Sequence, residues 1–235
     1  MARTHLRVEH SAVGYRRVLL SRPERRNAID LDLARALHDA LGEEEAAPVV
    51  LASSDPGVFC AGADMNLPDA DRATVSDLLY ACYEIMITRP GPVIAVITGP
   101  AVGGGAQLAA AADMRIAGPG ARLRWIGPAG PGLAVGAWVL TDLVGRGTAM
   151  ELALTGRWVA ATEAVAIGLL NRVEDNPDQV AAALAEKMAA QNPQVSASVK
   201  SVAAAAGLLD RLRAERRVNK SAWARWIPPT AGRAR

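Results

Sequence analysis

A run of glycines lies between a strand-like and a helix-like segment near the middle of the chain. Residues 92–97 (Pro-Val-Ile-Ala-Val-Ile) are apolar and rich in β-branched side chains, which predicts a buried strand. Residues 108–113 are mostly alanine, which favours a helix. Gly103, Gly104 and Gly105 therefore stand where a strand turns into a helix, and glycine lets the backbone bend and another molecule approach closely. The unpartnered amides at the positive end of a helix suit a negative or polarised oxygen, although a tight helix start without a ligand would have the same sequence.

The composition excludes several classes of protein. Of 235 residues, 51% are hydrophobic and 4% aromatic, which supports a core of alanine, valine and leucine, and a net charge of +2 gives no indication of a nucleic-acid partner. No apolar run is long enough to span a membrane and no signal peptide begins the chain, so we expect a cytoplasmic protein. Cys60 and Cys82 lack metal-binding spacing and the histidines are not clustered, so we expect no metal site.

The remaining pattern alternates strands and helices and then becomes helical, which predicts an α/β core at residues 1–175 and a helical region at 176–235. The expected strands are 16–20, 48–52, 92–97, 114–117 and 122–125, and the expected helices are 30–41, 74–87, 137–144, 149–154, 179–191, 195–208 and 209–226. Asp30 is expected to cap the first helix, and Thr162 a short helix that ends at Gly168.

The glycine turn does not match the common nucleotide-binding motifs. Leu108 takes the place of the last glycine in G-x-G-x-x-G, and no G-x-x-x-x-G-K-[ST] sequence occurs. Dinucleotide binding and phosphoryl transfer therefore lose their main support from the sequence.

Several segments are more specific together than any of them alone. In order they are Arg-Pro-Glu-Arg-Arg-Asn-Ala at 22–28, Phe-Cys-Ala-Gly-Ala-Asp at 59–64, Gly-Pro-Ala-Val-Gly-Gly-Gly-Ala-Gln-Leu-Ala at 99–109, Asp-Met-Arg-Ile-Ala at 113–117, Leu-Thr-Gly at 154–156, and Ala164 followed by Gly168-Leu169. With this order and spacing the chain resembles the crotonase superfamily, which includes enoyl-CoA hydratases and isomerases of fatty acid metabolism. The resemblance implies a spiral of ββα units, a C-terminal helical region that forms a homotrimer or hexamer, and an acyl-CoA ligand. It implies no cofactor beyond the CoA that the ligand carries.

The resemblance also implies an oxyanion hole in which the backbone amides of Ala63 and Gly104 hold the thioester carbonyl oxygen. Preorganised donors of this kind stabilise an enolate, typically by ~3 kcal/mol each. The further positions that it places at the substrate or CoA are Arg25, Arg26, Ala28, Ala61, Asp64, Met65, Gly103, Trp125 and Pro128. The two arginines would also suit a solvated loop and Asp64 an ordinary turn cap. Tyr80, Tyr83, Trp125 and Trp138 suit either an acyl tunnel or simple core packing.

The catalytic pair is where this chain departs from the superfamily, whose active hydratases carry two glutamates. The first position, three residues after the oxyanion glycine, is Gln107, and the second falls near Pro128 in a stretch, 117–141, without Asp or Glu. A neutral amide cannot take up a proton as a carboxylate can, and each general acid or base contributes ~10²–10⁴-fold. Asp142 and Glu84 are the carboxylates that could stand in, although either would also suit a solvated surface.

These observations predict an acyl-CoA-binding protein that is weak or inactive as a hydratase. The alternative is an active hydratase, isomerase, decarboxylase or thioesterase with a different acid or base. Decarboxylation tolerates a missing base best, because it needs only enolate stabilisation and a proton source. If the chain is instead an orthodox but weak hydratase, Gln107→Glu should raise its activity.

Overall fold

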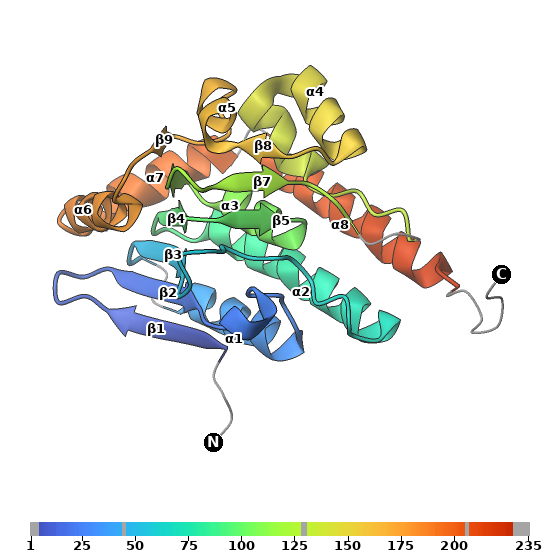
Figure 1. The fold of residues 1–235 in the computed structure, drawn as a ribbon. Helices are drawn as coiled ribbons and strands as arrows, with labels where there is room; N and C mark the ends of the chain where they lie inside the picture. Colours follow the sequence, from blue (N-terminus) through green and yellow to red (C-terminus); the bar gives the residue numbers. More distant parts are fainter. Residues whose placement is uncertain (1–4, 44–45, 128–130, 205–206, 228–235) are drawn as a thin grey trace.

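A six-stranded sheet runs through the computed structural model, which describes residues 5–43, 46–127, 131–204 and 207–227 (Figure 1). Its strands, in spatial order, are β1 (Leu6–His10), β2 (Arg16–Leu20), β3 (Val49–Ser53), β4 (Val93–Ile97), β6 (Met114–Ala117) and β9 (Arg172–Val173). The hairpin of β1 and β2 is antiparallel, and every later pairing in this sheet is parallel. Parallel neighbours need crossover connections, and helices supply them here.

A smaller sheet lies beside the first. It consists of β5 (Pro100–Val102), β7 (Arg122–Arg124) and β8 (Val159–Ala160), and Cys60 extends it through a bridge to Ala101. The chain passes three times from the large sheet to the small one and then into a helix, first after β3, then from β4 to β5 and then from β6 to β7. These passages are the ββα units of the expected spiral, so the predicted α/β fold class is confirmed.

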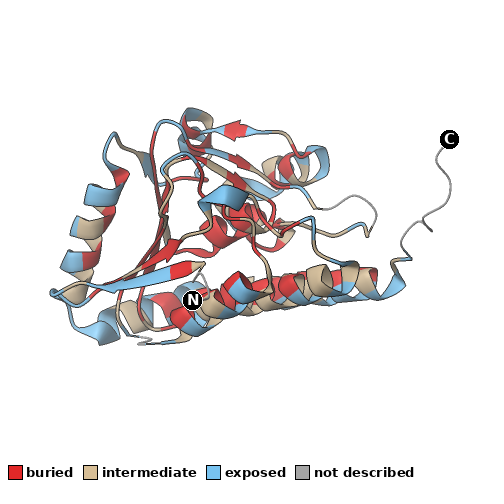
Figure 2. Cartoon of the chain, turned by 60° about the horizontal axis from the view of Figure 1, so that its bottom comes forward, coloured by how far each residue is buried: buried red, intermediate tan, exposed pale blue. Residues whose placement is uncertain are grey.

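The helices cover the sheets and close the core. They are α1 (Leu31–Gly42), α2 (Asp69–Thr88), α3 (Gly104–Ala111), α4 (Ala137–Thr155), α5 (Ala161–Ala166), α6 (Pro177–Ala189), α7 (Pro193–Ala204) and α8 (Leu208–Arg225), with a 3₁₀ turn η1 (Pro23–Arg25). The main core fills one face of the large sheet under α1 to α4, and a smaller cluster lies between the other face and α6 (Figure 2).

The C-terminal helix α8 lies along α2 and also contacts α4 (Figure 1). Its residues pair with α2 in reverse order along the chain, Arg213 with Glu84 and Arg216 with Asp77, so the two helices are antiparallel. This position brings Asn219 and Trp223 of α8 to the cavity that Gly103 and Gly104 line, where the site described below is built.

Most expected elements are present, and the exceptions have physical reasons. Asp30 caps α1 by accepting a hydrogen bond from Leu33 N at 2.9 Å, as predicted. Gly145, with φ of +74°, interrupts α4 where two helices were expected. The expected cap at Thr162 is wrong, because α5 begins after Ala160 and no side chain caps it. The short strands β1, β5 and β8 were missed, because two to five residues carry little periodicity of their own.

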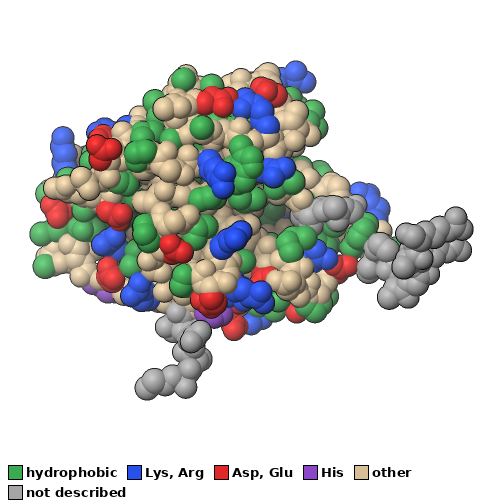
Figure 3. All heavy atoms as spheres, in the orientation of Figure 1, with side chains coloured by type: hydrophobic (Ala, Val, Ile, Leu, Met, Phe, Trp, Pro, Cys, Tyr) green, Lys and Arg blue, Asp and Glu red, His purple; other side chains and the backbone are tan. Residues whose placement is uncertain are grey.

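Other expected properties are visible only in part. The region 176–235 contains α6, α7 and α8, and the boundary of a core domain at residue 175 stays a prediction. None of the helices in the described ranges is long and apolar enough to cross a membrane. Within the same ranges no three His, Cys, Asp or Glu side chains gather as metal ligands. Basic and acidic side chains are interspersed over the face shown in Figure 3.

Candidate functional site

The backbone amides of Ala63 and Gly104 lie close together at the start of α3. Gly104 is the first residue of this helix and follows Gly103, whose φ of +54° favours glycine. A Cβ atom added to Gly104 would stand 3.9 Å from Ala63 N, and one added to Gly62 would stand 3.3 Å from Gly104 N. Neither N–H group has a hydrogen-bond acceptor among the described residues, and the first amides of a helix have none within it. Two donors are therefore free to bind one oxygen atom.

The loop that carries Ala63 is held from both sides. Ile29 N donates to Gly62 O at 2.7 Å, and Asp64 N donates to Ile29 O at 2.9 Å. The buried Asp64 carboxylate accepts from Arg22 Nη1 at 2.8 Å and from Asn66 N at 3.0 Å. Burial acts to raise the pKa of Asp64, but these hydrogen bonds outweigh it, and the pKa lies below its usual value. Asp64 thus fixes the loop and does not line the cavity beside it.

A cavity of about 270 Å³ opens in front of the two amides. Its lining residues are Ala61, Gly62, Ala63, Met65, Arg72, Ser76, Leu79, Tyr80, Tyr83, Val102, Gly103, Gly104, Gln107, Ile126, Gly127, Leu133, Val135, Asn219 and Trp223. Tyr83 stabilises the wall, since its hydroxyl donates to Gly104 O at 2.9 Å and its ring stacks on Trp138 with centroids 5.8 Å apart. The cavity is mostly apolar, so a carbonyl group placed there would find the two amides as its main partners.

Gln107 lies in this wall, but its oxygen is turned toward α4. Oε1 accepts from Gly136 N at 3.0 Å and from Trp138 Nε1 at 2.9 Å, and the residue is 5% exposed. A side-chain amide that is fixed in this way offers no proton acceptor to a ligand, because its remaining group is a donor. The position of the first hydratase glutamate therefore carries a neutral, anchored side chain.

Sequence reasoning missed two residues of α8 that complete the site. Glu215 accepts from Tyr80 Oη at 2.7 Å, Gly136 N at 2.9 Å and Trp138 N at 2.9 Å, and burial raises its pKa. Asn219 donates to Tyr80 Oη at 2.8 Å and to a backbone oxygen near the start of α4 at 2.7 Å. The available signal was the helical spacing of the buried face of α8, which is Leu212, Glu215, Asn219 and Ala222.

The two carboxylates expected to replace the glutamates lie elsewhere. Asp142 pairs with Arg211, and Glu84 accepts from Arg213 Nη2 at 2.6 Å. Neither lines the cavity in front of the amides, and Asp142 borders a separate cavity of about 260 Å³ near the end of α3. The catalytic roles expected for Asp142 and Glu84 therefore stay predictions, since neither side chain lines the cavity.

The other expected binding residues divide into three groups. Ala61, Met65 and Gly103 line the cavity. Arg25 and Arg26 are exposed on and after η1, and the half-buried Ala28 accepts from Arg22 through its carbonyl oxygen. Trp125 is fully buried outside the lining, where its ring leaves no room for a side chain on Gly136. Pro128 lies outside the described residues.

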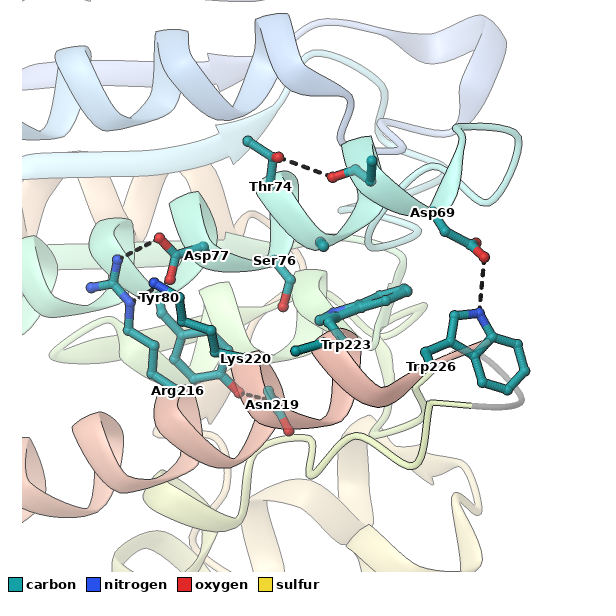
Figure 4. Close-up of a pocket in the computed structure, with 13 residues that line it drawn as sticks. Asp69, Thr74, Ser76, Asp77, Tyr80, Arg216, Asn219, Lys220, Trp223 and Trp226 are labelled. Carbon is teal, nitrogen blue, oxygen red and sulfur yellow. Dashed lines mark hydrogen bonds and ion pairs between the residues drawn. The ribbon is translucent and has the colours of Figure 1, made fainter. Parts of the chain in front are cut away.

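A groove of about 520 Å³ continues from the cavity between α2 and α8 (Figure 4). The cavity and the groove share Ser76, Tyr80, Asn219 and Trp223 in their walls. The acidic side chains of the groove are already engaged, because Asp77 pairs with Arg216 and Asp69 accepts from Trp226 Nε1. The cavity in front of the amides of Ala63 and Gly104 therefore continues into the groove between α2 and α8.

The fold corresponds to the crotonase superfamily. The structure of an enoyl-CoA hydratase/isomerase from Xanthobacter autotrophicus Py2 is similar with a TM-score of 0.85, covering 95% of this chain and 89% of that chain at 26% identity. An enoyl-CoA hydratase from Bacillus anthracis is similar with a TM-score of 0.78, covering 94% and 90% at 29% identity. Residues 11–227 match the model of the enoyl-CoA hydratase/isomerase family, and the chain belongs to this family. The "Probable enoyl-CoA hydratase echA6" of Mycobacterium leprae is 37% identical over 172 residues, which are 69% of this chain and 68% of that relative.

Proposed function

We propose that this protein binds acyl-CoA thioesters and is weak or inactive as an enoyl-CoA hydratase. The observation that carries the proposal is the pair of N–H groups of Ala63 and Gly104, which have no acceptor among the described residues and border a mostly apolar cavity. Two such donors suit a thioester carbonyl oxygen, and they would stabilise its enolate form as an oxyanion hole. Membership of the enoyl-CoA hydratase/isomerase family supports CoA thioesters as the ligand class.

The state of Gln107 supports weak turnover. Addition of water to an enoyl thioester needs a group that takes a proton from water and a group that protonates the α carbon. Gln107 is neutral, and its oxygen accepts from Gly136 and Trp138. The buried carboxylates nearby, Asp64 and Glu215, both accept hydrogen bonds from the protein, and neither lines the cavity. The geometry therefore favours holding the thioester over hydrating it.

The test uses the purified chain with a short and a long 2-enoyl-CoA. We expect thermal stabilisation by the ligand with no loss of the conjugated thioester absorbance. A ligand at a hundredfold excess over its Kd adds about 2.7 kcal/mol. For a chain of this size, such a gain raises Tm by roughly 5–10 °C. Rapid loss of absorbance would instead show an active hydratase, and no change in either measurement would contradict CoA thioesters as ligands.

A matched pair of glycine variants tests the role of the amides. Gly104→Ala places a methyl group 3.9 Å from Ala63 N, beside the two donors, and we expect this crowding to abolish the ligand-induced shift. Gly147→Ala in α4 meets no atom within 4 Å and should leave the shift unchanged. Equal shifts in both variants would contradict the proposed oxyanion hole. The oligomeric state and the CoA contacts of Arg25 and Arg26 stay predictions.

A further inference from the structure

Two side-chain oxygens share one backbone N–H group beside the cavity. Gly136 N donates to Gln107 Oε1 at 3.0 Å and to Glu215 Oε1 at 2.9 Å, so these two oxygens are less than about 6 Å apart. Both residues are buried, at 5% and 6% exposure. Water therefore does little to screen a charge at either position.

The surroundings of Glu215 are suited to one negative charge. The start of α4 supplies the N–H groups of Gly136 and Trp138, and a helix N-terminus stabilises an anion. The titratable groups that face Glu215 from α2 are Tyr80, which donates to it, and Tyr83. Among the described residues no lysine or arginine forms an ion pair with Glu215.

The charged residues of α8 near Glu215 are engaged elsewhere. Arg211 donates to Trp138 O and pairs with Asp142, and Arg216 pairs with Asp77. Arg72, the cationic side chain among the lining residues, pairs with Asp69, so in the described part of the wall every nearby cation is already engaged with another carboxylate. A carboxylate at position 107 would share the Gly136 N–H with Glu215, and like charges this close cannot both remain ionised without a large cost.

We propose that Glu215 supplies the one negative charge that this wall tolerates, and that position 107 is an amide because Glu215 is present. Glu215 is then a positioning residue, because it accepts from the same Gly136 N–H that donates to Gln107 Oε1 and so holds the start of α4 next to the Gln107 oxygen. The inference deepens the proposed function, since it explains why a thioester-binding site lacks the glutamate of a hydratase. The inference needs the proposed function only for this explanation. Its test measures the ligand-free protein and does not depend on that function.

The test measures Tm of the ligand-free protein at pH 5 and pH 8 for Gln107→Glu, Glu215→Gln and the double variant. We expect Gln107→Glu to lose roughly 5–10 °C at pH 8 and under about 2 °C at pH 5, where one carboxyl group takes a proton. The double variant again has one carboxylate, so at pH 8 it should be more stable than the sum of the two single losses predicts. Glu215→Gln alone should also lose stability, because its NH₂ group faces backbone donors.

Two controls separate charge from packing. Gln107→Met removes the amide without adding charge, and its loss should be the same at both pH values. Gln191→Glu adds a carboxylate at an exposed position and should change Tm by less than about 1 °C. If Gln107→Glu does not fold at pH 8, a folded double variant supports the proposal and an unfolded one overturns it.

Equal losses for Gln107→Glu at pH 5 and pH 8, or additive losses in the double variant, would also overturn the proposal. Because no acyl-CoA is present in these measurements, such a result would leave the proposed binding function untouched. Failure of ligand binding by the unaltered protein would in turn leave the charge coupling between positions 107 and 215 untouched.

Discussion

The two sides of the cavity are built in different ways. On one side the donors are backbone amides, and the short segments 59–64 and 99–109 that carry them also determine their geometry. On the other side the hydrogen bonds come from side chains of α3, α4 and α8, with Gln107 and Glu215 more than 100 residues apart in sequence. A backbone donor needs only the correct turn, whereas a side-chain network needs every partner in place. On the amide side, substitution of glycine should therefore have the larger effect on stability. On the α8 side, a change of charge should have the larger effect.

The largest expected effect separates two adjacent glycines on the amide side. A Cβ atom on Gly105 would stand 2.5 Å from the backbone oxygen of Cys60, which cannot move without breaking the small sheet. We expect Gly105→Ala to lose about 3 kcal/mol or more of unfolding free energy. A Cβ atom on Gly104 meets the flexible end of Leu79 at 2.9 Å, so Gly104→Ala should lose less than about 1 kcal/mol. Urea unfolding of both variants measures these losses. Equal losses would contradict the assignment of Gly105 to structure and of Gly104 to binding.

An intermediate effect contrasts the buried carboxylates of the two sides through the pH dependence of stability. The pKa of Asp64 lies below its usual value, so its stabilisation is present above the unfolded pKa of about 4 and is lost as pH falls through the folded pKa. The pKa of Glu215 is raised, so the folded state binds the extra proton and stability falls as pH rises above about 4.3 toward the folded pKa.

The matching variants should therefore respond to pH in opposite directions. With rising pH the deficit of Asp64→Asn, about 2 kcal/mol when complete, should grow through acid pH and then stay constant. The deficit of Glu215→Gln, of similar size at low pH, should shrink over its own window because the unaltered protein loses stability there. Denaturant unfolding of the three proteins between pH 3 and pH 8 checks the signs. If the deficits of both variants changed with pH in the same direction, the carboxylates of the two sides would not differ in their preference for the charged form.

The same contrast explains how far the sequence could predict the site. Gly104 could be predicted because local residues determine where a strand becomes a helix and which amides lack partners, whereas Ala63 was predicted only from the resemblance to the crotonase superfamily. Glu215 was not found, because it stands in an arginine-rich stretch where most carboxylates are solvated. Only the packing of α8 on α2 and α4 buries it. The anchored state of Gln107 was equally invisible, since its partners Gly136 and Trp138 belong to another element.

The smallest expected effect concerns the surface contacts of α8. Arg216 makes two hydrogen bonds to Asp77, at 2.8 and 2.9 Å, but the side chains are 31% and 43% exposed, so water and salt screen the pair. We expect Arg216→Ala to lose about 0.5–1 kcal/mol in low salt and less in high salt, as exposed ion pairs do. Urea unfolding at two salt concentrations measures this loss, with Arg217→Ala as the control, since Arg217 is exposed and forms no ion pair within the described part of the chain.

The size of this loss tests what holds α8 over the cavity. If Glu215 and Asn219 hold it through the buried network, Arg216→Ala should keep its ligand-induced Tm shift even where the ion pair is lost. A loss above 2 kcal/mol, or a ligand-induced shift that disappears with rising salt, would instead assign that role to the surface pairs. The α8 side would then depend on screened charges and not on the single buried carboxylate, and its contrast with the amide side would have a different cause.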